Sequence, residues 1–446
     1  MTDATVPAAR PSLLGDDART KRRQASEKRF QAYGLVAICI GLAMLIFLVW
    51  TIVGSGWNAF FQTRLNVSVP LVQEEIDKAE KGLLKTSAYR KLIGTALQAE
   101  LVEAGIETDM DDKELIGIVS KRASSELREY VLANPQAIGT TVEFNFLAQS
   151  FIDGYFKGRV TRDIAERSRN VSVSQLDLVD RMRQAGIIAK GFNLAFLTGN
   201  DASESSPEAA GFGPAIIGSL AMMIVVAIGS ITIGVAASIF LEEFAPRNRV
   251  TDLIEVNISN LAAVPSIVFG ILGLAVFINY LGPLSGDDWL KNNSAFVGGL
   301  VLTLMTLPTI IISTRASLRA VPQSIRDAAL GVGASKMQTV FHHVLPLAAP
   351  GILTGSIIGL AQALGESAPL LLVGLVLAQG ASLPENIGDF FGGPNTAMPA
   401  QIYQWSTRAD PAFYERAWGG IIILLVFLVT MNTLAVILRR RFERRW

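Results

Sequence analysis

One ionisable side chain, Glu366, lies near the middle of an apolar stretch of the sequence. A charged group at the centre of a bilayer costs about 3 kcal/mol even on lenient insertion scales, so a compensating partner or an aqueous cavity is expected. Gln362 precedes Glu366 by one helical turn on the same face. Glu366 and Gln362 are therefore candidates for a substrate path. The alternative is a structural ion pair, or a protonated acid that bonds a neighbouring helix.

Two arginines at the end of the preceding apolar stretch are candidate partners for this acid. Arg315 is the nearest by topology, and Arg319 follows one turn later. A carboxylate can hold an arginine in place until an oxyanion such as phosphate competes for the guanidinium. Ser313 belongs to a broad arc of hydroxyl side chains that can bond an oxyanion. The arginines can equally be the basic residues that mark a cytoplasmic helix end.

Small residues recur every fourth position before Glu366, which predicts a face for close helix packing. They are Gly351, Gly355, Gly359 and Ala363. Pro369 predicts a bend or break just beyond Glu366, which frees polar backbone groups within the membrane. The stretch is thus expected to pack tightly and to change shape.

The segment 324–346 predicts two short helices that reverse around glycine. Ser324 with Asp327, and Ser335 with Gln338, have the spacing of capping boxes. Gly333 lies between them, where a chain reversal favours a residue without Cβ. The second helix carries an apolar stripe and is expected to end at Pro346. The stripe consists of Met337, Val340, Phe341 and Val344. It must pack either on the protein's own helix ends or on a cytoplasmic partner.

The amino-acid composition indicates that the chain is a membrane protein, as these elements require. Of 446 residues 50% are hydrophobic and 17% are charged, whereas soluble domains have about a quarter charged. Six stretches are long enough to cross a bilayer: 32–54, 213–241, 258–281, 295–314, 351–378 and 418–438. The zero net charge gives no reason to expect nucleic-acid binding, and one cysteine with two adjacent histidines makes no standard metal site.

Basic residues flank the first and last spans, so both ends, 1–31 and 441–446, are expected in the cytoplasm. Segment 55–212 is then outside, and it reads as an inserted α+β domain. Helices are expected at 72–85, 88–105 and 112–133, and strands around 142–146 and 171–173. Segment 199–211 has the composition of a linker back to the membrane.

Asp327-Ala328-Ala329, Gly333 and Leu345-Pro346 resemble the EAA loop of binding-protein-dependent ABC permeases. Asp327 stands where that family has glutamate, and His343 stands where an aliphatic residue is usual. The resemblance implies a coupling helix that sits in a groove of an ATPase subunit. Residues 331–336 lack the spacing of a phosphate-binding loop, so ATP is expected to be hydrolysed by the partner. This chain is then a transport subunit, not an enzyme, and binds no cofactor.

Four further segments are similar to PstA-type phosphate permeases: 211–220, 264–277, 306–322 and 361–374. The resemblance implies an all-α, MetI-like core of five membrane helices within 213–440, preceded by an anchor at 32–54. It also implies a phosphate importer in the bacterial inner membrane, with a PstC-like permease, a PstB-like ATPase dimer and a periplasmic phosphate-binding protein. The insert resembles an N-terminal extension found in a subset of such permeases.

Three other functions remain open on the sequence. The chain can be an ABC permease for sulfate, molybdate or an organic solute. It can be a membrane-anchored sensor whose 55–212 domain binds a ligand, although its cytoplasmic segments are short and carry no enzyme motif. It can be a passive channel, which needs no ATPase-docking loop.

Overall fold

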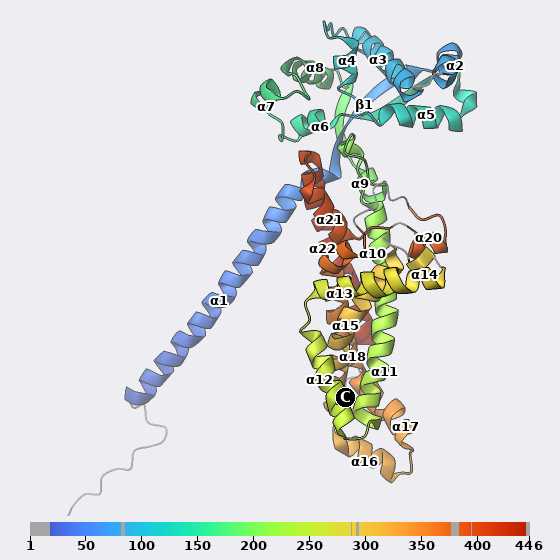
Figure 1. The fold of residues 1–446 in the computed structure, drawn as a ribbon. Coiled ribbons are helices and arrows are strands. Elements are labelled where there is room, and N and C mark those ends of the chain that lie inside the picture. Colours follow the sequence, from blue (N-terminus) through green and yellow to red (C-terminus); the bar gives the residue numbers. More distant parts are fainter. Residues whose placement is uncertain are drawn as a thin grey trace, which may run out of the picture. The chain divides into compact units, whose positions relative to one another are not determined.

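The computed structural model describes residues 18–81, 85–286, 288–290, 294–375, 383–393 and 395–442. The chain divides into two compact units, Met1–Gly54 and Ser55–Trp446. Helix α1 (Ala18–Gly56) makes up the described part of the first unit and is one uninterrupted helix (Figure 1). The second unit holds a small α+β part and a helical bundle.

The number of helical segments of the described residues that are long and apolar enough to cross a membrane is six, as predicted. They are Thr20–Phe60, Gly213–Phe244, Ser266–Ser285, Ala295–Arg319, Lys336–Gly365 and Pro411–Arg441. The main helices within the last five are α10 (Gly213–Val226), α11 (Thr232–Ile239), α13 (Ser266–Gly273), α15 (Ala295–Arg319), α18 (Leu345–Gly365) and α22 (Pro411–Phe442). The shorter helices between them are α12 (Arg249–Ala262), α14 (Gly282–Ser285), α16 (Gln323–Gly331), α17 (Lys336–Thr339), α19 (Ala368–Leu372), α20 (Ile387–Gly392) and α21 (Met398–Thr407). The third span begins at Ser266 and not at 258, because α12 ends before Pro265.

The fifth span corrects two sequence predictions. It begins at Lys336 and not at 351, because the helix continues through Pro346. That proline lies two residues after a π-helical turn, Val340–Val344, where the hydrogen-bond register already changes and a proline is tolerated. The span also ends at Gly365 and not at 378. Glu366 is extended, at φ −79° and ψ 125°, since the ring of Pro369 cannot fit against the carbonyl of Gly365 in a continuing helix.

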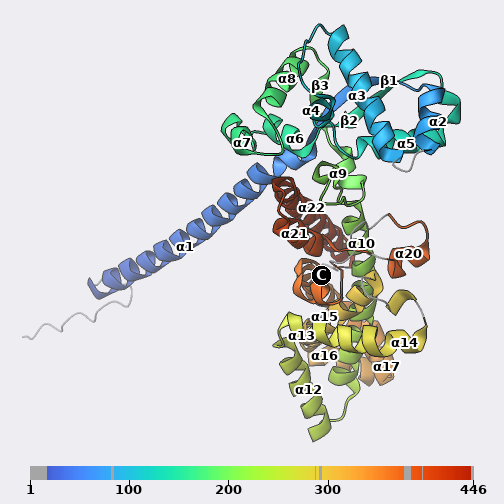
Figure 2. The same ribbon diagram turned by 45° about the horizontal axis from the view of Figure 1, so that its top comes forward.

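The α+β part is built on a three-stranded antiparallel sheet (Figure 2). Strand β1 (Phe61–Pro70) lies between β2 (Thr141–Leu147) and β3 (Ile188–Phe192), with Val67 opposite Phe144 and Thr63 opposite Lys190. Its helices are α2 (Gln73–Lys81), α3 (Lys85–Glu103), α4 (Asp112–Ile116), α5 (Ala123–Ala133), α6 (Ser150–Phe156), α7 (Arg162–Arg167), α8 (Val173–Gln184) and α9 (Leu194–Thr198). The predicted α+β class is therefore confirmed.

Two details of this part differ from the prediction. The strand expected at 171–173 is wrong: Ser172 caps α8 in a reciprocal capping box with Gln175, so Val173 starts a helix. The single helix expected over 112–133 is divided into α4 and α5. Between them Val119 bridges to Ala148 and Ser120 N–H donates to the carbonyl of Leu147, so this segment extends the edge of the sheet.

The segment 199–211 leads into α10 as predicted, but it is packed into the protein and is not the loose linker that its composition suggests. Asp201, Glu208 and Ala210 are all buried. The carboxylate of Asp201 accepts hydrogen bonds from Trp405 Nε1 at 3.0 Å and from Arg408 Nη2 at 3.1 Å. The partners that order this segment lie about two hundred residues later in the chain, so its local composition could not reveal them.

The predicted small-residue face forms the contact between α15 and α18. A Cβ atom on Gly351 would lie 2.9 Å from Ser317 Cβ, and one on Gly359 would lie 3.3 Å from Ile310 Cγ1. A Cβ on Gly355 would overlap the side chain of Ser313. Glycine thus allows the two helix backbones to approach closely, as expected for membrane helices.

Gly355→Ala is expected to destabilise the protein by about 1–3 kcal/mol, because the added methyl group overpacks this contact. Thermal unfolding in detergent measures the effect. Gly365→Ala is the matched control, since a Cβ atom there meets no atom within 4 Å. Equal melting temperatures of the two variants would contradict a close α15–α18 contact.

Candidate coupling site and substrate path

The loop between α15 and α18 contains the two short helices α16 and α17 (Figure 1). The capping box of α17 is confirmed: Ser335 Oγ accepts from Gln338 N–H at 3.2 Å, and Gln338 Oε1 accepts from Ser335 N–H at 2.9 Å. Gly333 adopts φ 91°, the left-handed region that favours glycine. The box predicted for Ser324 and Asp327 is wrong. Pro322, not Ser324, is the N-cap of α16, and Asp327 accepts a hydrogen bond from Gln323.

The apolar stripe of this loop is divided between the interior and the surface. Val340 and Val344 are buried with Leu318 of α15, so one half packs on the protein's own helix ends. The other half is uncovered, with Met337 58% and Phe341 44% exposed. Leu330 and Val332 are exposed as well, and Val332 has 87% of its surface free. Several large apolar side chains of one short loop are thus largely exposed in the part of the chain that the structure describes.

The six residues that carry the EAA resemblance differ in exposure. Asp327, Ala328, Gly333 and Pro346 are exposed, Ala329 is buried and Leu345 is partly buried. A buried alanine fits the packing of α16 on the bundle, and the exposed positions lie on the same loop as the uncovered apolar side chains.

Carboxylates at the end of the Gly213–Phe244 span hold the arginines of α15. Arg315 donates from Nε to Glu242 at 3.2 Å and from Nη2 to Glu255 of α12 at 2.5 Å. Arg319 donates to the other oxygen of Glu242 at 2.8 Å. Arg315 therefore pairs with these two acids and not with Glu366, the partner considered from the sequence. The pairs link α15 to two other helices at this end of the bundle.

Arg326 links α16 to the same helix end. Its Nη2 lies 2.7 Å from Glu243 Oε1, and the two side chains are 13% and 8% exposed. Arg326 Nη1 donates to the carbonyl of Val321 at 2.7 Å, and Nη2 donates to the carbonyl of Leu318 at 2.9 Å. One guanidinium thus joins α16, the end of α15 and the end of the Gly213–Phe244 span. Its planar fork suits such a multiple contact better than a lysine would.

A second contact joins α17 to that span. The ammonium group of Lys336 lies 5.3 Å from the ring centroid of Phe244, a cation–π distance. A cavity of about 400 Å³ lies between this contact and the Arg326–Glu243 pair, with Arg247 and Arg319 in its lining. Both short helices of the loop therefore contact the turn Phe240–Phe244 directly.

The proposed path residues do not form one cluster in this structure. Glu366 is partly buried, and its side chain forms no hydrogen bond or ion pair with any residue that the structure describes. Gln362 is exposed on α18, one turn before it. Ser313 faces Gly355 in the α15–α18 contact, and its hydroxyl donates to the carbonyl of Ile310. Arg315 and Arg319 belong to the glutamate pairs described above.

The sequence analysis missed four charged residues of this site: Glu242, Glu243, Glu255 and Arg326. A weak signal existed, since two adjacent acids directly follow an apolar span and an arginine directly precedes Asp327. Their pairing joins positions 60 to 83 residues apart, which spacing alone does not show.

Comparison with known proteins identifies the family of the helical bundle. Residues 230–446 match the family "Binding-protein-dependent transport system inner membrane component". The chain is 32% identical over 239 residues to the phosphate transport system permease protein PstA of Mycobacterium leprae, covering 53% of this chain and 73% of that protein. The chain belongs to the PstA family of ABC transporter permeases. As a PstA-family protein with six membrane-spanning helices, it is a multi-pass membrane protein.

Other matches are to further ABC transporter proteins. The chain is 30% identical to the probable ABC transporter permease protein YqgI of Bacillus subtilis, over 52% of this chain and 80% of that one. The MetNI methionine ABC transporter in inward-facing conformations has 17% identity and a TM-score of 0.41, over 52% of this chain and 95% of that one. A bacterial alginate ABC transporter has 14% identity and the same TM-score, over 52% and 80%. Residues 17–166 match a domain of unknown function, DUF3333.

Proposed function

We propose that this chain is a membrane-spanning permease subunit of an ATP-driven importer of inorganic phosphate. The observation that carries the proposal is the loop 324–346. It has the EAA resemblance, it is fastened to the ends of two spans by Arg326, and it presents uncovered apolar side chains. An exposed apolar face that the chain itself does not cover is typical of a binding site for a partner protein. Phosphate is the cargo named for the PstA relatives.

The partners follow from this assignment. A PstC-like permease completes the translocation path. A PstB-like ATPase dimer binds the 324–346 loop, and a periplasmic phosphate-binding protein delivers the substrate. ATP is hydrolysed by the ATPase subunits, and this chain holds no cofactor. Asp327, Ala328, Ala329, Gly333, Leu345 and Pro346 form the ATPase-coupling segment.

The proposed orientation in the bacterial inner membrane places both termini in the cytoplasm. Support comes from the basic residues before the first span and after the last, together with the even number of spans. The loop 324–346 then lies in the cytoplasm, as an ATPase-binding loop must. The α+β part lies outside, between the first span and the permease core of 213–440.

The mechanism that we propose is mechanical. Closure of the ATPase dimer displaces α16, and the buried Arg326–Glu243 pair passes the displacement to the Gly213–Phe244 span. Arg315 and Arg319 hold α15 to the same helix end, so two spans move with the loop. The outcome is a switch between inward-open and outward-open states. No bond of the substrate is broken.

Glu366 and Gln362 are the proposed path residues of α18. An acid that pairs with no residue in the described part of the chain must face a cavity or another subunit to be tolerated in a membrane. The helix break at Glu366 also leaves backbone donors and acceptors that a path can use. Arg315, Arg319 and Ser313 support the moving helices, and release of an arginine from Glu242 would expose it to phosphate.

Labelled-phosphate uptake by proteoliposomes that contain the complete complex tests this function. Uptake is expected to require ATP and the binding protein, and excess sulfate or molybdate should leave it unchanged. Uptake that persists without ATP would indicate a channel. Transport of sulfate or molybdate in place of phosphate would reject the proposed cargo.

Gly333→Val is expected to reduce phosphate uptake several-fold, because a β-branched residue at φ 91° distorts the turn between α16 and α17. Gly331→Val is the matched control: it lies two residues away, has equally open surroundings, and lacks the positive φ. ATPase activity and uptake of the purified complexes are measured side by side. Equal transport by both variants would show that the shape of this turn is not needed for coupling.

A further inference from the structure

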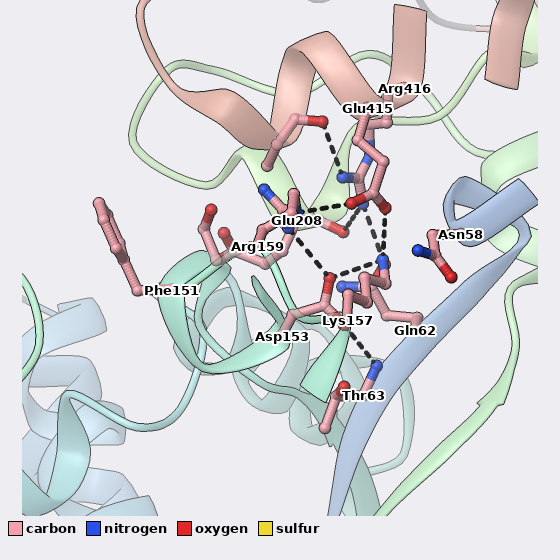
Figure 3. Close-up of polar contacts among 12 residues, drawn as sticks. Asn58, Gln62, Thr63, Phe151, Asp153, Lys157, Arg159, Glu208, Glu415 and Arg416 are labelled. Atoms are coloured by element: carbon pink, nitrogen blue, oxygen red, sulfur yellow. Dashed lines mark hydrogen bonds and ion pairs between the residues drawn. The ribbon is translucent and has the colours of Figure 1, made fainter. Parts of the chain in front are cut away.

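The α+β part is joined to the bundle by a buried cluster of charges (Figure 3). Lys157 Nζ lies 2.7 Å from Glu415 Oε1 of α22 and 2.7 Å from Asp153 Oδ2, with none of its side chain exposed. Arg159 Nε lies 2.6 Å from the other oxygen of Glu415. Asp153 in turn accepts a hydrogen bond from the backbone N–H of Thr63 in β1. The first turn of α22 is thereby tied to α6 and to the central strand.

The neighbouring residue of α22, Arg416, is completely buried. Its Nε donates to the carbonyl of Ala210 at 3.0 Å. Its Nη2 donates to the carbonyl of Glu208 at 2.6 Å and to Gln62 Oε1 at 3.0 Å. One side chain therefore ties α22 to β1 and to the 199–211 segment that leads into α10.

At this junction three cations, Lys157, Arg159 and Arg416, meet the carboxyl groups of Asp153, Glu208 and Glu415, with the carboxyl group of Asp410 nearby. Burial raises the pKa of the Glu208 carboxyl, and the hydroxyl of Ser120 donates to it. Buried ions that are paired and hydrogen-bonded in this way tolerate little displacement, because any separation leaves a charge without solvent or partner.

An aromatic cluster beside the charges contains residues of the α+β part and of the helical bundle. The ring of Trp405 in α21 lies 5.3 Å from Phe212, which precedes α10, and 6.2 Å from Phe196 in α9. Phe413 of α22 lies 6.5 Å from Trp405. Leu364 of α18 packs in the same cluster, two residues before Glu366. The packing thus extends from the α+β part to the helix break.

We propose that the α+β part is a brace that fixes the outer ends of α10, α21 and α22 as one rigid body. The orientation and the path are those of the proposed function, on which this inference rests. Arg416 and Glu415 are its positioning residues. The outer end of the translocation path then opens when the other spans move relative to the braced helices. Glu366 lies at the boundary between these two groups of helices. The proposal thus gives a role to the matched residues of the α+β part.

Spin-label distances in the assembled complex test the brace. The single cysteine, Cys39, is replaced by alanine, and labels are placed at Leu132 of α5 and Tyr403 of α21, which are both exposed. We expect a narrow distance distribution that is the same without nucleotide and with trapped ATP. A distance that changes between the two states would overturn the proposal. A second pair, Leu284 with Tyr403, reports movement of α14 relative to the braced body.

Variants separate a brace from ordinary packing. Arg416→Met and Glu415→Gln are expected to broaden the Leu132–Tyr403 distribution and to lower uptake several-fold. The milder Glu415→Gln serves if Arg416→Met does not assemble. Lys157→Met leaves Glu415 with one cation fewer and is expected to broaden the distribution as well. An unchanged distribution in Glu415→Gln and Lys157→Met would overturn the proposal.

The distance measurements do not depend on which solute the complex carries. Failure of the brace can therefore be distinguished from failure of the proposed phosphate cargo.

Discussion

Arg326→Met is expected to lower phosphate uptake at least about tenfold while the assembled complex continues to hydrolyse ATP. The substitution removes the buried pair with Glu243 and the hydrogen bonds to the carbonyls of Leu318 and Val321. Breaking one partner of a fully buried pair costs about 3–5 kcal/mol, and even half of that loss in this partly buried pair exceeds the ~1.4 kcal/mol of a tenfold change. The α16 helix would then move without displacing the Gly213–Phe244 span. The ratio of phosphate transported to ATP hydrolysed measures this loss.

A double variant distinguishes lost coupling from lost stability. Arg326→Met/Glu243→Leu removes both charges, and such replacements of a buried pair are often neutral or stabilising. We expect the double variant to assemble normally and to remain uncoupled. Arg247→Met is the matched control, because Arg247 lines the same cavity, is exposed, and forms no ion pair within the described part of the chain. Normal transport by the double variant would exclude the pair as a transmission contact.

Glu366→Gln is expected to reduce phosphate uptake about tenfold or more without lowering the amount of assembled complex. Glutamine keeps the shape and removes the charge, and a neutral side chain is less costly in a membrane than a carboxylate. A purely structural acid that has no partner among the described residues should therefore tolerate the change or gain from it. Initial rates of uptake at saturating binding protein are compared with thermal stability of the same preparations.

Glu385→Gln provides the comparison for this variant, since Glu385 is exposed in the segment between α19 and α20. Its uptake should equal that of the unaltered complex. If Glu366→Gln transports equally well, the acid has no role in the path. If it transports poorly but also melts at a lower temperature, the acid stabilises the assembly instead.

The sequence predicted what depends on neighbouring residues. Apolar length gave the six spans, and the Gly351–Gly355–Gly359 spacing gave the α15–α18 contact. The positive φ of Gly333 and the capping box at Ser335 also follow from local residues. These features are local because helix propagation, caps and turns involve positions within a few residues of each other.

What depends on distant residues could not be predicted. Arg315 was considered beside Glu366, yet its acids come from helices 60 and 73 residues earlier. The 199–211 segment has a linker composition, yet Trp405, Arg408 and Arg416 from distant parts of the chain hold it in place. Pro346 was expected to end a helix, but the π-helical turn before it lets the helix continue. Each error is a tertiary contact or a change of helical register that overrides the local preference.

The pairing of Lys157 with Glu415 also bears on how the protein is made. Because synthesis runs from the N-terminus, the lysine emerges from the ribosome 258 residues before its partner. The sheet around it can form early, yet its buried ammonium stays without Glu415 until the last hydrophobic segment is inserted. A chain cut short before that segment leaves the Lys157 ammonium with Asp153 and without the carboxylate of Glu415.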